Sequence, residues 1–155
     1  MTDQQQQDTP EMAVWLGYGG LVPFAICAAA AHGGTPILAA YGLIGAANYG
    51  AIILSFVGAI HWGLAMQDDR HVYWFSWSVT PALLAWAAVS VLDVRLSMLA
   101  LVPAFTLAWS VDRQAFQRGL LPAWYMRLRH ILTAGAVVGL LFTAFAPAIT
   151  CLLYT

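Results

Sequence analysis

The chain has 155 residues, of which 61% are hydrophobic and 8% are charged, and its formal net charge is −1. Soluble globular domains carry about 25% charged residues, so this composition excludes them. It also excludes a nucleic-acid-binding surface, because phosphate binding needs a concentration of basic side chains. The apolar residues fall in blocks of about 18 to 25, the length that crosses a roughly 30 Å hydrocarbon core. We therefore expect an all-α fold, a polytopic membrane helical bundle with five transmembrane helices.

Residues 1–11 are polar, acidic and rich in glutamine. They offer no apolar surface to bury, so we expect a disordered cytoplasmic tail. The tail lacks the basic start of a secretory signal and the arginines of a transit peptide, so the first span should stay in the mature protein. Residues 12–155 should form a single transmembrane domain. Its expected spans are at about 13–31, 46–66, 73–92, 96–111 and 124–147.

Two features should shape the first two spans. Pro23 removes a helix hydrogen bond from the first span and should kink it. The apolar run from residue 33 to residue 46 leaves two alternatives. It either forms a long tilted helix with the second span, or an interfacial helix broken near Gly42 and Gly45.

The second span should be the central helix of the bundle. Small side chains recur in it at every fourth residue and predict a ridge for close helix packing. His61 stands about 200° around the helix from Ala59, and a histidine in the membrane should face protein or water. Both faces of this helix should therefore be covered. The predicted ridge consists of Ala47, Ala51, Ser55, Ala59 and Gly63.

His61 is the most informative polar residue. As a functional residue it would hold a ligand, a proton or a metal. As a structural residue it would be a neutral imidazole bonded to a carbonyl that Pro81 or Pro103 frees on a neighbouring helix. A haem would need a second axial histidine at the same depth, and His130 should lie about one to two turns too shallow. We expect no metal or cofactor.

The segment after the fourth span mixes arginines with aromatic residues. Asp112 would form an ion pair there with Arg127 or Arg129. Alternatively, the arginines beside the aromatic rings hold the phosphate of an anionic lipid, or they only anchor the chain at the interface. The acidic residues occupy loop positions where solvation explains them, and no catalytic constellation can be assembled. The candidate polar cluster comprises His61, Trp62, Asp112, Trp124, Tyr125, Arg127 and Arg129.

Small residues outside the second span carry two further expectations. Gly135 and Gly139 form a GxxxG pair, which predicts a close helix contact within the bundle in preference to one between subunits. Cys27 and Cys151 have no neighbour at metal-ligand spacing and are interpreted as apolar fillers, although the topology leaves a disulfide between them open.

The arginines indicate how the chain crosses the membrane. With five spans, one side holds all of them except Arg95, and the amino terminus lies on that arginine-rich side. The positive-inside rule then places the amino terminus in the cytoplasm. The side that includes the amino terminus holds Arg70, Arg113, Arg118, Arg127 and Arg129.

Several short motifs are distributed along the folded chain. They are Leu16-Gly17, Gly20-Leu21, Pro23-Phe24, Tyr49-Gly50-Ala51, Ser55-Phe56, His61-Trp62-Gly63, Pro122, Trp124-Tyr125, Leu128-Arg129 and Leu132-Thr133. Together these motifs resemble the transmembrane protein 69 family, a domain of unknown function, over nearly the whole folded chain. His130 and Arg118 are not part of the family pattern. The resemblance implies a small multispan protein of bacterial inner membranes or, in eukaryotes, of mitochondria, and it brings no catalytic residues with it.

These observations lead to one principal hypothesis and one alternative. The protein should be a multi-pass protein of the bacterial inner (plasma) membrane. We expect a non-enzymatic accessory or assembly factor, with the lipid bilayer and either a larger membrane complex or a second copy as its partners. The alternative is a binder of a lipid-soluble small molecule, a quinone or a phospholipid, held by His61 and the arginine–aromatic interface. A transporter is disfavoured, because the spans show no repeat and no string of polar residues at mid-membrane.

Overall fold

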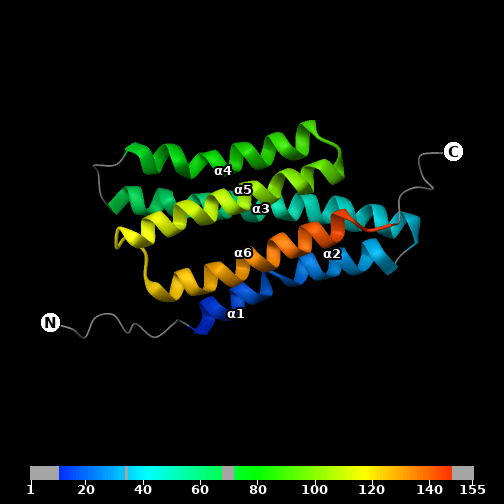
Figure 1. Cartoon of the computed structure of the whole chain (residues 1–155), viewed down its shortest axis with the longest axis horizontal. Helices are drawn as coiled ribbons and strands as arrows, with labels where there is room; N and C mark the ends of the chain where they lie inside the picture. Colours follow the sequence, from blue (N-terminus) through cyan, green and yellow to red (C-terminus); the bar gives the residue numbers. More distant parts are fainter. Residues whose placement is uncertain (1–10, 34, 68–71, 148–155) are drawn as a thin grey trace.

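The computed structural model describes residues 11–33, 35–67 and 72–147 (Figure 1). These ranges form helices and no strand. Counted together, α1 and α2 make one span, so that five helical segments are long and apolar enough to cross a membrane. The expected all-α fold with five spans is confirmed. The helices are α1 (Glu11–Gly19), α2 (Val22–Gly33), α3 (Pro36–Gln67), α4 (Val72–Val91), α5 (Val94–Gln117) and α6 (Ala123–Ala144).

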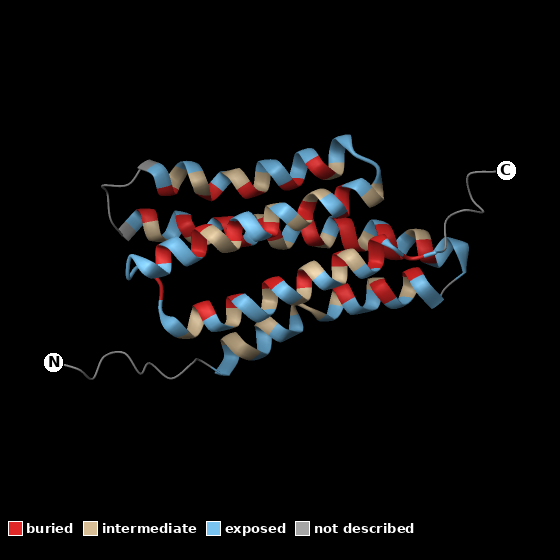
Figure 2. Ribbon diagram, in the orientation of Figure 1, coloured by how far each residue is buried: buried red, intermediate tan, exposed pale blue. Residues whose placement is uncertain are grey.

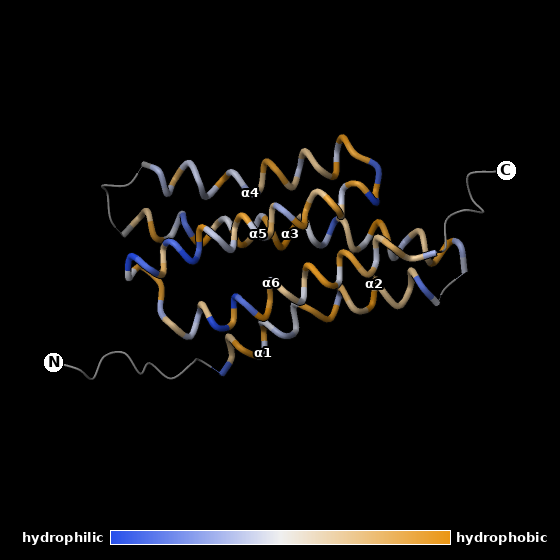
Figure 3. The backbone as a smooth tube through the Cα atoms, in the orientation of Figure 1, coloured by the Kyte–Doolittle hydropathy of each residue, from blue (hydrophilic) through white to orange (hydrophobic). Residues whose placement is uncertain are grey.

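The helices run up and down along one long axis (Figure 1). Glu11, the end of α3, the start of α4 and the α5–α6 connection lie at one end, which we call the amino-terminal end. The connections α2–α3 and α4–α5 lie at the opposite end. Hydrophilic residues gather at the α5–α6 connection and at the turns, whereas the middle of the bundle is apolar (Figure 3). This distribution matches a bundle whose long axis crosses the bilayer.

The first span is broken where proline predicted a kink. α1 ends at Gly19 and α2 begins at Val22, with Pro23 in its first turn, where a missing N–H costs least. The break leaves the Gly20 carbonyl free of the helix ladder, and the hydroxyl of Tyr49 donates a hydrogen bond to it at 2.9 Å. The break is therefore satisfied by α3, as a backbone group in lipid requires.

The second span is one continuous helix that starts earlier than expected. α3 begins at Pro36 rather than near residue 46, and its 32 residues give a length of about 48 Å. Gly42 and Gly45 do not break it. A Cβ added to Gly42 would lie 2.6 Å from the Cys27 carbonyl oxygen, so this glycine lets α2 approach closely. Of the two alternatives for residues 33–46, the structure adopts the long helix.

α3 is central, as expected, and packs against α2, α4, α5 and α6. Buried residues gather along α3 and on the helix faces turned toward it (Figure 2). Three glycines, each eight residues from the next, turn by about 80° at each step around this helix. Gly42 meets α2, Gly50 meets leucines of α5 and α6, and Gly58 meets the Ser78 carbonyl of α4. α2 and α4 thus each approach α3 at one glycine, and α5 and α6 share the third.

The predicted four-residue ridge is only half correct. Ala47 and Ala51 are buried, but Ala59 and Gly63 at the other end of the ridge are exposed. Four residues turn a helix by about 400°, so a straight ridge drifts by about 40° at each step and leaves the interface. The eight-residue glycine pattern follows the neighbours more closely.

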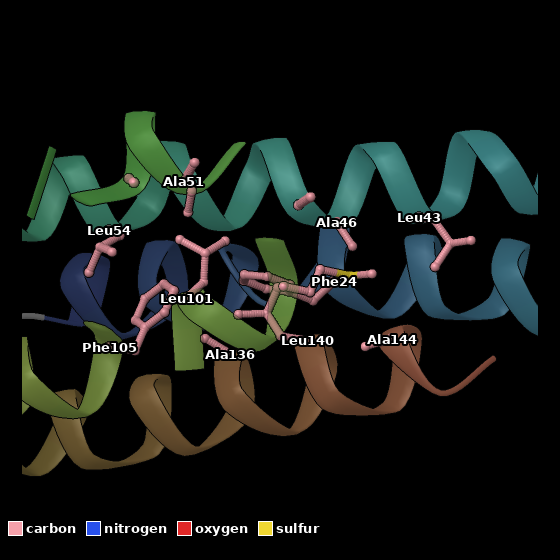
Figure 4. Packing of buried hydrophobic residues seen from close by; sticks show 14 of the residues in the cluster. Phe24, Leu43, Ala46, Ala51, Leu54, Leu101, Phe105, Ala136, Leu140 and Ala144 are labelled. Carbon is pink, nitrogen blue, oxygen red and sulfur yellow. The ribbon is translucent and has the colours of Figure 1, made fainter. Parts of the chain in front are cut away.

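The apolar interior falls into two clusters. The larger one, here the main core, joins Phe24, Leu101, Phe105 and Leu140 around α3 (Figure 4). A smaller cluster near the amino-terminal end contains Trp74. The GxxxG pair packs within the bundle, because a Cβ on Gly135 or Gly139 would meet residues of the first span at 2.8 or 2.9 Å.

The last two spans also differ at their ends from the expected ranges. α5 continues from Val94 to Gln117 and ends before Gly119, which has a positive φ of 75°. Asp112 therefore belongs to a helix rather than to a loop. α6 ends at Ala144, and Arg95 donates hydrogen bonds to the Ala144 and Ala146 carbonyls at 2.8 and 2.7 Å, which ties the start of α5 to the end of α6.

Replacing Gly58 by alanine tests the packing of α3. A Cβ at Gly58 would lie 2.6 Å from the Ser78 carbonyl oxygen, whereas a Cβ at Gly63 meets nothing within 4 Å. We expect Gly58→Ala to lower the free energy of unfolding in detergent by about 1–3 kcal/mol, as overpacking does. Gly63→Ala should leave stability unchanged or raise it by about 0.5–1 kcal/mol, since alanine favours helix. Equal effects at both positions would contradict the packing described here.

Candidate functional site

Three helices bring a carboxylate, a guanidinium and an imidazole together inside the bundle. Arg129 of α6 donates from Nε to Oδ2 of Asp112 of α5 at 2.5 Å. The Nε2 atom of His61 of α3 lies 3.3 Å from the other carboxylate oxygen. The exposed fractions of His61, Asp112 and Arg129 are 0%, 0% and 4%. We call these three residues the polar triad.

The triad lies between the two apolar clusters. On α3, His61 is flanked one turn away on each side by Val57 of the main core and Ala65 of the smaller cluster. On α5, Asp112 stands in the same way between Ala108 and Ala115. Each triad residue is within about two turns of a helix end at the amino-terminal end of the bundle. The sequence therefore inserts one polar layer into an otherwise apolar interior.

The structure corrects our expectation for Asp112. Sequence reasoning placed the acidic residues in solvated loops, but Asp112 is fully buried in α5. Of the two arginines considered as its partner, Arg129 forms the pair and Arg127 is exposed. Arg127 and Arg129 differ by about 200° around α6, so only one of them faces the bundle.

Two aromatic rings of α4 pack against His61. Its ring stacks on Trp74, with centroids 5.3 Å apart and planes 20° apart, and meets the edge of Trp77 at 6.5 Å. The expected hydrogen bond to a carbonyl freed by Pro81 or Pro103 is replaced by the approach to Asp112. The spacing of Trp74 and Trp77, one helical turn, was a signal that both could face one neighbour.

The other predicted residues lie around the triad. The Tyr125 hydroxyl donates to Oδ2 of Asp112 at 3.3 Å, and the Trp124 ring packs edge-on against Tyr125. Trp62 is exposed and contacts Phe75, so it takes no part in the triad. Arg118, outside the family pattern, lies over the Trp74 ring at 5.7 Å.

His130 does not face His61, but the reason differs from the expected one. We expected His130 to lie too shallow. Its neighbour Arg129 contacts the same carboxylate as His61, so this part of α6 reaches the level of His61. His130 itself is exposed and packs edge-on against Trp109. Direction around the helix, rather than depth, separates the two histidines. Cys151, for which a disulfide with Cys27 was left open, lies outside the described residues.

A cavity of about 410 Å³ adjoins the triad between α1, the start of α2, α3, α5 and α6. We call it the chamber. Apart from Tyr125, Arg129 and the indole of Trp124, its described lining consists of apolar side chains and glycines. Another hollow of about 510 Å³ lies between α4 and α5, but its described lining is wholly apolar. The chamber lining includes Leu16, Phe24, Ile60, Phe105, Tyr125 and Arg129.

The triad leaves hydrogen-bonding capacity unused. Within the described residues, the terminal nitrogens of Arg129 donate no hydrogen bond, and Nη2 is buried. The approach of His61 Nε2 to Asp112 lacks hydrogen-bond alignment. Thr133, one turn after Arg129, also has a buried hydroxyl without a partner in this part of the chain. Buried donors in an apolar setting are costly. Of these residues with unused donors, only Arg129 belongs to the chamber lining, so an acceptor placed beside Arg129 would be stabilised.

Breaking the ion pair from one side should destabilise the fold strongly. Asp112→Asn or Arg129→Gln alone leaves one buried charge without its partner and should lower the free energy of unfolding in detergent by about 3–5 kcal/mol. The double variant removes both charges and should recover most of that loss. Arg127→Gln, on the exposed face of α6, is the control and should change stability little. Additive losses in the double variant would argue against a coupled pair.

Comparison with known proteins agrees with the motifs in the sequence. A family model described as "Protein of unknown function (DUF3429)" matches residues 9–145. Transmembrane protein 69 of Xenopus tropicalis is 32% identical over 138 residues, covering 86% of this chain and 54% of that protein. Transmembrane protein 69 of Mus musculus is 26% identical over 144 residues, covering 88% of this chain and 56% of its own length.

The chain thus spans about half the length of these two curated relatives. No solved structure matches the chain significantly. The family match covers most of the chain, including all three residues of the triad. The protein is therefore an integral membrane protein that belongs to the DUF3429 family and is related to transmembrane protein 69.

Proposed function

We propose that the protein binds a lipid-soluble small molecule in the chamber. The observation that carries the proposal is a guanidinium with unused N–H donors in the wall of an apolar cavity. Ligand sites commonly combine apolar walls with a few polar groups that fix orientation, in volumes of about 300–1,000 Å³. The chamber, at about 410 Å³, falls in this range.

Different residues of the chamber lining would contact different parts of the ligand. The apolar side chains contact a hydrocarbon body, and Arg129 donates a hydrogen bond to a polar head. Asp112 accepts from Nε of Arg129 and from Tyr125, and so holds the guanidinium in place. His61 does not line the chamber, so it supports Asp112 rather than contacting the ligand. This proposal keeps the alternative hypothesis from the sequence, a binder of a lipid-soluble small molecule. It assigns the contact with the polar head to Arg129 instead of His61.

The route into the chamber leads from the lipid. Leu16 of α1 and Phe56 of α3 line the chamber, yet their exposed fractions are 72% and 69%. On a membrane protein, such exposed apolar side chains face hydrocarbon. α1 contributes no buried residue to the bundle, which makes it the least firmly packed wall. A ligand dissolved in the bilayer therefore meets the chamber without crossing water.

An accessory or assembly role is the competing proposal. It was motivated by surfaces of small residues that could receive a partner helix. Gly135 and Gly139 now contact the first span of the same chain, which leaves fewer such surfaces for a partner. Co-purification from native membranes tests this role, and a reproducible membrane-protein partner would support it.

We further propose that the protein resides in a bacterial inner membrane with its amino terminus in the cytoplasm. Arg113, Arg118 and Arg127 belong to the amino-terminal end of the bundle, and Arg95 belongs to the opposite end. Arg129 is used inside the bundle, so it no longer counts as a surface charge. The remaining asymmetry still favours this orientation.

Cysteine labelling tests the orientation. In a background without Cys27 and Cys151, Met12→Cys should react with a membrane-impermeant maleimide only after the cells are opened, because it lies at the cytoplasmic end. Leu92→Cys, next to the α4–α5 turn, should react in intact spheroplasts. The reverse pattern would overturn the proposed orientation.

Filling the chamber tests ligand binding. Ile60 lines the chamber from α3, whereas Ile52 on the same helix does not line it and is 63% exposed. Native mass spectrometry of protein released from nanodiscs should detect a retained small molecule. Ile60→Trp should lose at least about 90% of it, because a cavity filled by a side chain cannot accept a ligand, and Ile52→Trp should retain it. Equal retention by both variants, or no retained molecule in the unmodified protein, would contradict the proposal.

A further inference from the structure

The charge of the chamber restricts the head group that it can accept. Asp112 and Arg129 carry opposite formal charges and contact each other, so the triad is neutral when His61 is neutral. Arg129 is the only charged side chain in the described lining. A phosphate placed against it would add a negative charge that no second cation balances. In an apolar interior an unbalanced charge is strongly unfavourable.

The number of donors points in the same direction. Tyr125 already donates to Asp112, so Arg129 and Trp124 are the residues of the described lining whose side chains keep N–H groups that donate no hydrogen bond. Phosphate groups have many acceptor lone pairs and are usually held by several donors. A carbonyl oxygen accepts one or two hydrogen bonds and carries no net charge. The available donors fit the carbonyl and leave a phosphate mostly unsatisfied.

A phospholipid can still place its phosphate elsewhere. The first turn of α6 has free backbone N–H groups, as every helix start does. That turn precedes Arg129 by about 9 Å along the helix axis. A phosphate bound there would lie at the headgroup level and would not contact Arg129. Binding of such a phosphate would therefore not depend on the triad, whereas binding of a ligand inside the chamber would.

We infer that the chamber accepts a long-chain molecule with an uncharged carbonyl head, the chemistry of a quinone, whose carbonyl oxygen accepts a hydrogen bond from Arg129. This inference rests on the proposed ligand-binding function. Arg129 is the contacting residue, and Asp112 is a positioning residue that acts through it. The hydrocarbon tail leaves the chamber toward lipid between α1 and α3, past Leu16 and Phe56.

Three compounds with the same decyl tail test the inference on the full chain in one detergent. They are decyl-benzoquinone, decylbenzene and decyl phosphate, and calorimetric affinities are expressed as mole fractions in the micelle. The quinone should bind at least about tenfold more tightly than decylbenzene, the gain expected from a hydrogen bond to a charged donor. It should also bind more tightly than decyl phosphate, and its affinity should not change with salt.

Variants identify the source of that preference. In Asp112→Asn/Arg129→Gln the tenfold preference for the quinone over decylbenzene should largely disappear, while decylbenzene binding stays the same. Arg127→Gln should keep the preference. If the double variant does not fold, the comparison of the three compounds on the unmodified chain still decides the inference.

The two levels of the proposal fail in different ways. Tighter binding of decyl phosphate, or equal binding of the quinone and decylbenzene, would overturn the carbonyl inference. If Ile60→Trp abolished binding in either case, the chamber would remain a ligand site. If no compound bound in a manner sensitive to Ile60→Trp, the proposed function would fail together with the inference.

Discussion

The buried ion pair between Asp112 and Arg129 is the interaction on which the arrangement of the last two spans depends. Neither charge can be left alone inside a bilayer, because an unpaired ion in hydrocarbon is far less stable than a paired one. The pair therefore fixes the rotation of α5 relative to α6. At the opposite end of these helices, Arg95 holds the two carbonyls at the end of α6. Two arginines, one at each end, set both the rotation and the register of this hairpin.

α3 positions the remaining helices through the glycines on its surface. Gly42 lets α2 approach, Gly50 lets α5 and α6 approach, and Gly58 lets α4 approach. Between membrane helices there is no water to expel, so close backbone contact replaces the hydrophobic effect as the source of packing energy. His61 interrupts this apolar helix at the level of the ion pair. The rings of Trp74 and Trp77 pack against His61 and so bring α4 into the same layer.

Sequence patterns predicted the features that depend on length and local chemistry. The apolar blocks predicted the five spans, and Pro23 predicted a kink where the first span is broken. The pair of Asp112 with Arg129 was one of the two ion pairs that we expected. The failures share one physical cause, since they concern which way a side chain points in three dimensions. Asp112 follows an apolar run, so the sequence predicts that the span ends there. In the structure, α5 continues to Gln117 and the Asp112 side chain faces the interior of the bundle. The chamber is lined by residues of five helices and of the break between α1 and α2, and no local sequence pattern encodes the distances between these elements.

The length of α3 has a consequence for the bilayer around the protein. At about 48 Å, α3 exceeds a roughly 30 Å hydrocarbon core, and it contains no charged residue from Pro36 to Gln67. Its surplus turns cannot enter water without exposing apolar side chains. The helix must therefore tilt, or the lipids beside it must stretch, and either response costs a fraction of a kcal/mol per Å of mismatch. That cost decreases as acyl chains lengthen, so lipid thickness is itself a determinant of this fold.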